Sequence, residues 1–217
     1  MLYKHGVSRV IEDYLVTIIR LEEEYGVAKT GDIALSLNVS PGTVTNTLAR
    51  LKKMGLIERT PYKGVRLTER GRQLALDILK RHRLVERLLT DVLGVEWYKV
   101  HEIAHKLEHG VDGIERYLEN VLGPVSTCPH GNPILMEKKR QHEVPMAQIR
   151  KRGAYVVVRI VMEDEDTLKY LEERGIKPGT IFIFEERDVD KVKIKIGEEV
   201  IILDGKFPRA IIVREAK

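Results

Sequence analysis

The spacing of apolar residues changes once along the chain, and this change limits the folds that the chain can adopt. From residue 7 to residue 122 apolar side chains recur at the helical period, whereas from residue 155 to residue 213 they alternate with polar ones. We therefore predict an α+β fold in which helices come first and a small β domain follows. No apolar run approaches the roughly 18 residues that cross a bilayer, so we expect a soluble, cytoplasmic protein without a membrane partner.

Residues 1–75 are predicted to form a winged helix-turn-helix DNA-binding domain. Its expected elements are helices at 7–25, 31–37 and 41–54 and strands at 56–59 and 65–67. Ser40 is a typical helix N-cap, and Pro41 suits the first helical position. Two short helices joined by a tight turn make a helix-turn-helix, and the strand pair with Lys63 at its tip makes a wing.

The positive charge of the chain is concentrated in the same region. The net charge is only +4, but residues 29–72 hold nine basic and three acidic side chains, enough to neutralise several phosphates. Small residues and Asn46 lead the third helix, so we expect sparse base reading: thymine-methyl contacts and an Asn46 contact to adenine. The DNA-binding residues predicted for bases or phosphates are Ser40, Gly42, Thr43, Thr45, Asn46, Arg50, Lys53, Lys63 and Arg66.

Two further domains follow. Long helical patterns at 69–93, 97–109 and 112–122 predict a helical dimerisation and metal-binding domain over residues 76–142. Residues 143–152 are expected to be a linker. Five short alternating segments over residues 153–217 predict a small β-barrel with an acidic helix at 163–175, and the family resemblance described below implies that this barrel is SH3-like. The expected strands are 155–160, 180–184, 192–196, 200–203 and 210–213.

Histidines at helical spacing are the most informative feature for function. His101, His105, Glu108 and His109 fall within an arc of roughly 100° on an ideal helix, so they can line one face. His82 and Glu86 are one turn apart on the preceding helix. Because the chain has a single cysteine, Cys128, neither a disulfide framework nor a four-cysteine zinc site is available. These residues predict metal sites built from His and carboxylates.

Three alternatives have to be weighed against this interpretation. The string His101-Glu102-Ile103-Ala104-His105 matches the zinc-hydrolase motif, but five residues are a weak signal and Glu102 can equally be a surface carboxylate. A winged-helix regulator that senses a small organic ligand would use the same histidines structurally. Cys128 and His130 could form another metal site, although the prolines and glycine around them favour a turn.

The chain resembles the diphtheria-toxin-repressor family of metal-dependent transcriptional regulators over essentially its full length. The resemblance rests on residues 80–89 (KRHRLVERLL), 99–102 (KVHE), 107–109 (LEH) and 131–134 (GNPI), together with the first helix around 14–18. It implies a non-enzymatic homodimer that represses transcription. It also implies two metal sites: a primary site of Asp13, His105, Glu108 and His109, and an ancillary site of His82, Glu86, His101 and a residue of the barrel, for which we choose Asp164.

Two departures from the family pattern bear on the choice of ion. Asp13 replaces the methionine of iron-type members and His105 replaces their cysteine, so both changes remove sulfur. Manganese-type members have further carboxylates where this chain has Val16 and His105. An oxygen and nitrogen site favours Fe(II) or Mn(II), and Zn, Co and Ni are expected to substitute. The ion would join the first helix to the dimer domain, and the dimer would read a pseudo-palindromic operator with recognition helices about 34 Å apart.

Overall fold

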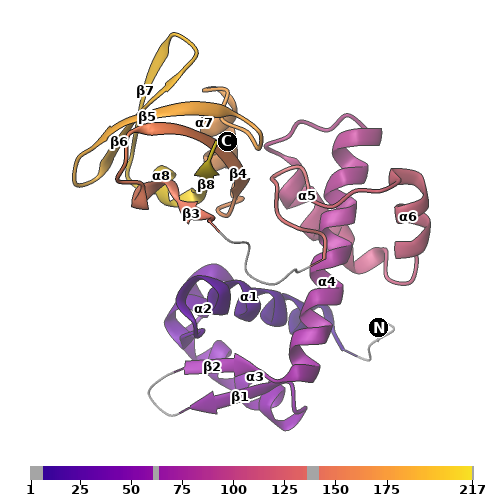
Figure 1. Ribbon diagram of the computed structural model, residues 1–217. Helices are drawn as coiled ribbons and strands as arrows, with labels where there is room; N and C mark the ends of the chain where they lie inside the picture. The colour runs from indigo at the N-terminus through magenta and orange to yellow at the C-terminus, as the bar shows by residue number, and fades with distance from the viewer. Residues whose placement is uncertain (1–6, 61–63, 136–141, 217) are drawn as a thin grey trace. The chain divides into compact units, whose positions relative to one another are not determined.

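The computed structural model describes residues 7–60, 64–135 and 142–216, and it divides into two compact units. The first unit contains residues 1–82 and 108–115. The second unit contains residues 83–107 and 116–217. Figure 1 shows helices at the N-terminal end and a sheet at the C-terminal end, which confirms the predicted α+β class. Within the described residues, no helix is both long and apolar enough to span a bilayer.

The first unit is a winged helix-turn-helix. Ser40 Oγ accepts a hydrogen bond from Thr43 N at 3.1 Å, which caps the third helix as predicted. Ala28 forms an isolated bridge with Val65 and so attaches the segment before the second helix to the wing. The elements are α1 (Arg9–Tyr25), α2 (Thr30–Ser36), α3 (Pro41–Lys53), β1 (Ile57–Thr60), β2 (Gly64–Leu67) and the greater part of α4 (Glu69–Arg87).

Apolar side chains from all these elements form one core, in which Leu15, Ile33, Leu48 and Ile78 are almost fully buried. Glu22 near the end of α1 also fixes the wing, because its carboxylate accepts from Leu67 N at 2.5 Å and pairs with Arg72 at the start of α4. The wing and α4 are therefore anchored to α1 by charge as well as by packing.

The second unit combines short helices with an antiparallel sheet. After α4 the chain makes a π-helical turn (Leu88–Val92), then α5 (Val100–Leu107) and, beyond a 3-10 turn (Glu108–Gly110) that belongs to the first unit, α6 (Glu115–Leu122). The six-stranded sheet has the order β3-β8-β4-β5-β6-β7. Its strands are β3 (Val144–Pro145), β4 (Gly153–Ile160), β5 (Ile181–Arg187), β6 (Lys191–Ile196), β7 (Glu199–Asp204) and β8 (Ile211–Glu215).

One of these strands lies within the expected linker. Val144 and Pro145 pair with Val213 and Ile212 of β8, so the sheet begins nine residues before the predicted barrel boundary. A segment of two residues is too short for an alternating pattern to be recognised, so this strand was not predicted. Helix α7 (Glu165–Glu172) and the short α8 (Phe207–Ala210) complete the domain. Trp97 joins the apolar core of the sheet with Phe182 and Leu168.

The turn at residues 128–133 is bound tightly to β4. Ile160 N donates to His130 O at 2.8 Å, and Asn132 Nδ2 donates to Ile160 O at 2.7 Å. Gly131 has φ +86°, and a Cβ built there would lie 2.2 Å from Val158 O. Glycine is therefore required both for the backbone conformation and for the close approach to the strand.

Candidate metal centre

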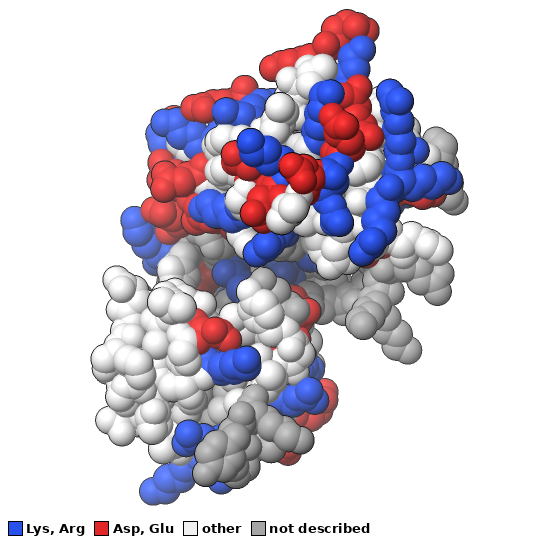
Figure 2. All heavy atoms as spheres, turned by 90° about the vertical axis from the view of Figure 1, so that its left-hand side faces the viewer, with Lys and Arg blue, Asp and Glu red and all other residues white. Residues whose placement is uncertain are grey.

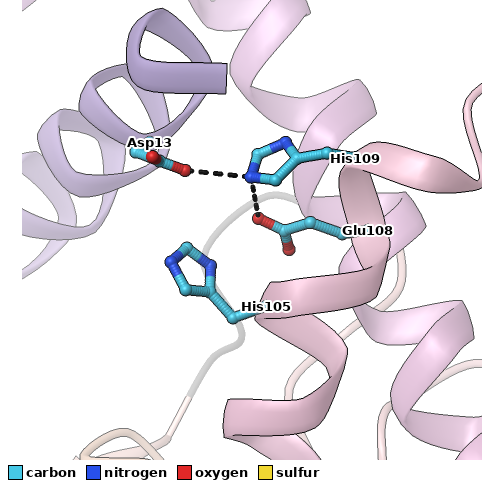
Figure 3. A group of neighbouring side chains, drawn as sticks. All are labelled: Asp13, His105, Glu108 and His109. Atoms are coloured by element: carbon cyan, nitrogen blue, oxygen red, sulfur yellow. Dashed lines mark ion pairs between the residues drawn. The ribbon is translucent and has the colours of Figure 1, made fainter.

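Three side chains with metal-binding groups meet in the first unit (Figure 3). Asp13 projects from α1, and Glu108 and His109 come from the 3-10 turn after α5. Donor atoms of the three lie within 4.8 Å of one another. His109 Nε2 is 3.1 Å from Asp13 Oδ1 and 3.6 Å from Glu108 Oε1. His105, also drawn in Figure 3, is exposed and precedes Glu108 by three residues, which makes the two neighbours along the helical path.

His109 is surrounded by carboxylates. Its Nδ1 lies 2.6 Å from Oε2 of Glu12, a fully buried residue adjacent to Asp13 on α1. Burial alone would lower the pKa of His109, but hydrogen bonds to Asp13 and Glu12 and the charge of Glu108 raise that pKa to about 9. The imidazole of the metal-free protein is therefore protonated at neutral pH and partly neutralises three carboxylates.

His82 contacts this first cluster rather than standing apart from it. Its Nδ1 lies 2.6 Å from Oε2 of Glu108, and both side chains are buried. The family resemblance implied that His82 belongs to the ancillary site. The structure shows that its ring also holds the Glu108 carboxylate, so His82 positions one of the predicted primary ligands.

The residues of the first cluster fit a divalent cation of intermediate hardness. All donors are oxygen or nitrogen, the set that suits Mn(II) and Fe(II). Asp13 Oδ1 is buried and pairs with His109 Nε2 at 3.1 Å. A buried carboxylate needs an opposite charge beside it, and a bound cation would supply that charge once His109 has lost a proton.

A second cluster lies in the second unit around Glu86 of α4. His101 Nδ1 of α5 is 2.9 Å from Glu86 Oε1 and 3.6 Å from Glu163 Oε2. On the other side, His130 Nδ1 is 3.4 Å from Glu86 Oε1 and 3.2 Å from Glu163 Oε1. Cys128 completes the group, since donor atoms of Glu86, Cys128, His130 and Glu163 all lie within 4.8 Å of one another.

Histidines largely compensate the acidic groups of the second cluster. Burial alone would raise the pKa of Glu163, but the charges of His101 and His130 lower that pKa to about 2. Burial raises the pKa of the Cys128 thiol to about 12, and the charge of Glu86 adds to this. Cys128 is therefore a thiol in the metal-free protein, and its Sγ donates toward Glu163 Oε1 at 3.9 Å.

The structure places Asp164, the predicted barrel ligand, outside this cluster. Its carboxylate caps α7 by accepting from Thr167 N at 3.0 Å, and it also accepts from Lys206 Nζ at 3.0 Å. A capping side chain is turned back onto its own helix, which leaves the preceding residue free to point elsewhere. That residue is Glu163, and it takes the position expected of Asp164.

The prediction that one helix face carries four ligand-type side chains was only partly right. It placed four ligand types on one helix face, but His101 faces Glu86 whereas Glu108 and His109 face Asp13. The reason is that α5 ends at Leu107 and the chain continues as a tighter 3-10 turn, which rotates the last two side chains. Sequence reasoning missed Glu12 as a partner of His109 and left Cys128 and His130 as a turn. Residues 128–133 do form the expected turn, and His130 Nδ1 of this turn also lies 3.2 Å from Glu163 Oε1.

The predicted DNA-reading residues of α3 and the wing form an accessible surface. Ser40, Gly42, Thr43, Thr45, Asn46, Arg50, Lys53 and Arg66 are all exposed, and Lys63 lies outside the described residues. The Thr45 hydroxyl donates to Pro41 O at 2.9 Å, which leaves its methyl group as the group available for an apolar contact. In the view of Figure 2 the first unit carries few charged side chains, whereas basic and acidic side chains alternate over the C-terminal domain.

Comparison with known proteins accounts for almost the whole chain. Residues 7–65 match the N-terminal DNA binding domain of iron dependent repressors, residues 68–136 match their metal binding and dimerisation domain, and residues 144–215 match the FeoA domain. The diphtheria toxin repressor of Corynebacterium efficiens is 37% identical over 183 residues, which cover 78% of this chain and 80% of that protein. The chain belongs to the iron-dependent repressor family.

Other family members are similar along nearly their full length. The iron-dependent repressor IdeR of Mycobacterium bovis is 34% identical and covers 94% of this chain, and 96% of its own length is covered. The crystal structure of IdeR from T. acidophilum superposes with a TM-score of 0.81 at 31% identity, covering 94% of this chain and 97% of that one. A manganese-dependent transcriptional repressor in complex with manganese gives a TM-score of 0.86 at 27% identity, covering 95% and 100%.

Membership of the iron-dependent repressor family decides between the alternatives. Members are DNA-binding repressors and not enzymes, which confirms the prediction that this chain is no hydrolase. Glu102, which would be the general base of the hydrolase motif, is exposed on α5. The metal binding and dimerisation domain over residues 68–136 also favours a metal over a small organic ligand as the signal.

Proposed function

We propose that this protein is a homodimeric repressor of metal-ion homeostasis genes, activated by Fe(II) or Mn(II) at a primary site of Asp13, His105, Glu108 and His109. The observation that carries the proposal is the excess of carboxylates around His109. Glu12, Asp13 and Glu108 come from two segments of the first unit, and all three contact the His109 ring. When bound, the ion supplies the positive charge that this site lacks.

Three of the proposed ligands come from two segments of the first unit. Asp13 lies on α1, whose apolar face forms the core behind α3, whereas Glu108 and His109 lie in the turn after α5. Holding both segments at one cation selects a narrower set of positions for α3 in each subunit. We infer that the bound ion orders α3 before the dimer meets its operator. Less conformational entropy is then lost when DNA binds.

A second ion is proposed for the cluster around Glu86. Its ligands would be Glu86, His101 and Glu163, with His82 one turn earlier on α4. Cys128 and His130 offer two more donors on the opposite side of the same carboxylates, a set that includes sulfur and therefore suits softer ions such as Zn(II) or Co(II). The two sets share Glu86 and Glu163, so one ion is expected here at a time.

The proposed operator is pseudo-palindromic DNA read by a homodimer, in the cytoplasm. Tyr117 and Val121 lie one turn apart on α6 and are 69% and 65% exposed, a face suited to a second copy of the dimerisation domain. Two recognition helices would enter successive major grooves about 34 Å apart. Asn46→Ala should relax specificity at one or two base positions, and uniform weakening across operator variants would argue against base reading by Asn46.

Operator titration at buffered free metal concentrations tests the proposal. A duplex selected from a random library in the presence of Mn(II) serves as the probe, and binding is followed by fluorescence anisotropy after chelation and after return of Mn(II), Fe(II), Co(II) or Zn(II). Asp13→Ala should lose ion-dependent binding, whereas Glu102→Ala, which removes an exposed carboxylate of α5, should keep it. Equal DNA affinity with and without metal in the natural protein would refute the metal switch.

A further inference from the structure

Glu12 and Asp13, two consecutive residues of α1, contact the two nitrogens of one imidazole. His109 Nδ1 lies 2.6 Å from Glu12 Oε2, and His109 Nε2 lies 3.1 Å from Asp13 Oδ1. An ionised carboxylate only accepts hydrogen bonds, so the Glu12 contact requires the hydrogen on Nδ1. The geometry points to Glu12 as the residue that positions His109, by holding the hydrogen on Nδ1 so that Nε2, which faces Asp13 and Glu108, is the nitrogen left to bind an ion. This inference rests on the proposed function, in which His109 is a metal ligand.

Arg81 in turn holds Glu12. Its guanidinium is 1% exposed, and Nη2 lies 3.3 Å from Glu12 Oε1, the oxygen that does not face His109. The same guanidinium lies 2.7 Å from Asp112 Oδ1 and 3.9 Å from Glu115 Oε1. Arg81 therefore connects α1 to the segment 108–115 within the first unit, and it does so without an ion. The orientation of Glu12 is fixed from both ends.

A carboxylate behind a ligating histidine has a recognised physical effect. It fixes the tautomer and orientation of the ring and makes the ligating nitrogen a better donor, and loss of such a partner commonly costs about 10–100-fold in metal affinity. Glu12 meets the geometric requirement because it is fully buried and cannot exchange its imidazole contact for water. Glu12 belongs to neither of the two predicted sets of metal ligands, so the role inferred for it is distinct from coordination.

Two substitutions of Glu12 separate positioning from general stability. Glu12→Gln keeps an oxygen that accepts from Nδ1 but removes the charge, whereas Glu12→Leu removes the acceptor. We expect Mn(II) affinity at the primary site to fall about 10–100-fold in Glu12→Gln and further in Glu12→Leu. Glu115→Gln is the control, because Glu115 contacts Arg81 but not His109. It should leave Mn(II) affinity unchanged.

The decisive readout is the tautomer of His109, which a purely structural role would not change. Long-range nitrogen–proton NMR spectra of the Zn(II)-loaded protein should show the hydrogen on Nδ1 in the natural protein and in Glu12→Gln. They should show a mixture or the opposite tautomer in Glu12→Leu. If Glu12→Leu binds Mn(II) as tightly as the natural protein while Asp13→Ala does not bind it, the positioning role is refuted and the metal site stands. If Asp13→Ala binds normally, the proposed function fails first.

Discussion

The two clusters of ligand-type side chains differ in how complete they are without an ion. Around His109, three carboxylates contact one histidine, whose pKa is raised to about 9, and the buried Asp13 oxygen is paired with that same ring. Around Glu86, two carboxylates face two histidines, and the turn at 128–133 is bound to β4 by backbone hydrogen bonds. A cation thus has more to change at the first cluster, and the second is closer to a finished structural element.

The two clusters also differ in the chemistry of their donor atoms. The first cluster offers oxygen and nitrogen, whereas the second adds the sulfur of Cys128. Ion selectivity of the two positions should therefore differ, with Mn(II) and Fe(II) favoured at the first and softer ions accepted at the second. Four experiments, given in decreasing order of expected effect, test whether the two clusters differ in this way.

The largest effect is expected for a primary ligand. Glu108→Gln removes a buried charge that contacts both His82 and His109. It should lower Mn(II) affinity by more than the about 100-fold that is lost when only a hydrogen-bond partner of a ligand is removed. Ion-dependent DNA binding should disappear with it, as measured by isothermal titration and anisotropy. Glu102→Gln on the preceding helix α5 is the matched control. Normal activation of Glu108→Gln would show that the first cluster is not the switch.

Neighbouring acidic residues of the second cluster should behave differently. Glu163→Ala should lower the number of ions bound per chain by one, because Glu163 contacts both His101 and His130. Asp164→Ala should keep that ion and lower the free energy of unfolding by about 1 kcal/mol through loss of the α7 cap. Equilibrium dialysis and urea unfolding measure the two quantities. Loss of the ion in Asp164→Ala alone would reverse the assignment.

The contributions of the two clusters to the stability of the metal-free fold should be lost at opposite ends of the pH scale. The raised pKa of His109 stabilises the metal-free fold fully below the unfolded pKa of 6.5, and this stabilisation is lost as pH rises through about 9. The depressed pKa of Glu163 stabilises the fold above the unfolded pKa of 4.5, and this contribution is lost as pH falls toward about 2.

Ion binding has the corresponding sign. Because coordination requires an unprotonated Nε2, Mn(II) affinity at the first cluster should increase by up to about tenfold per pH unit as pH approaches 9. Urea unfolding of the metal-free protein as a function of pH and Mn(II) titration in buffers of different ionisation enthalpy provide the measurements. Affinity that falls with rising pH would contradict the assignment of His109 as a ligand.

The smallest effect on DNA binding is expected for Cys128→Ser. Co(II) bound through sulfur gives a charge-transfer band in the near ultraviolet, which the substitution should remove while Mn(II) activation is unchanged. His130→Gln should weaken the same band, since His130 faces the same two carboxylates. A natural protein without this band would exclude the thiol from the second site.

Much of the fold could be predicted from local chemistry. Ser40 and Pro41 marked the start of α3, and alternating apolar residues located five of the six strands. Local patterns could not locate β3, because two residues carry no period. They also could not show that α4 continues as a π-helical turn from Leu88 to Val92, where the sequence predicted one uninterrupted helix.

The first cluster was more predictable than the second. Asp13, Glu108 and His109 were identified through the family resemblance, and the structure brings them together. Glu12 was missed because a buried acidic residue on a helix looks like any other acidic residue until its partner, 97 positions away, is known. Glu163 was passed over for Asp164 because only the observed cap distinguishes two adjacent carboxylates. Long-range pairing and side-chain direction are the information that one sequence lacks.

Gly131 gives the second cluster an unusual dependence on one position. Its backbone angle and its closeness to Val158 O leave room for nothing larger than a hydrogen atom. Even an alanine there would push the loop away from the strand, and the thiol of Cys128 and the imidazole of His130, which both precede it, would move with it. The composition of a metal pocket would then change by a mutation that touches no donor, so evolution could retune ion preference here through loop clearance alone.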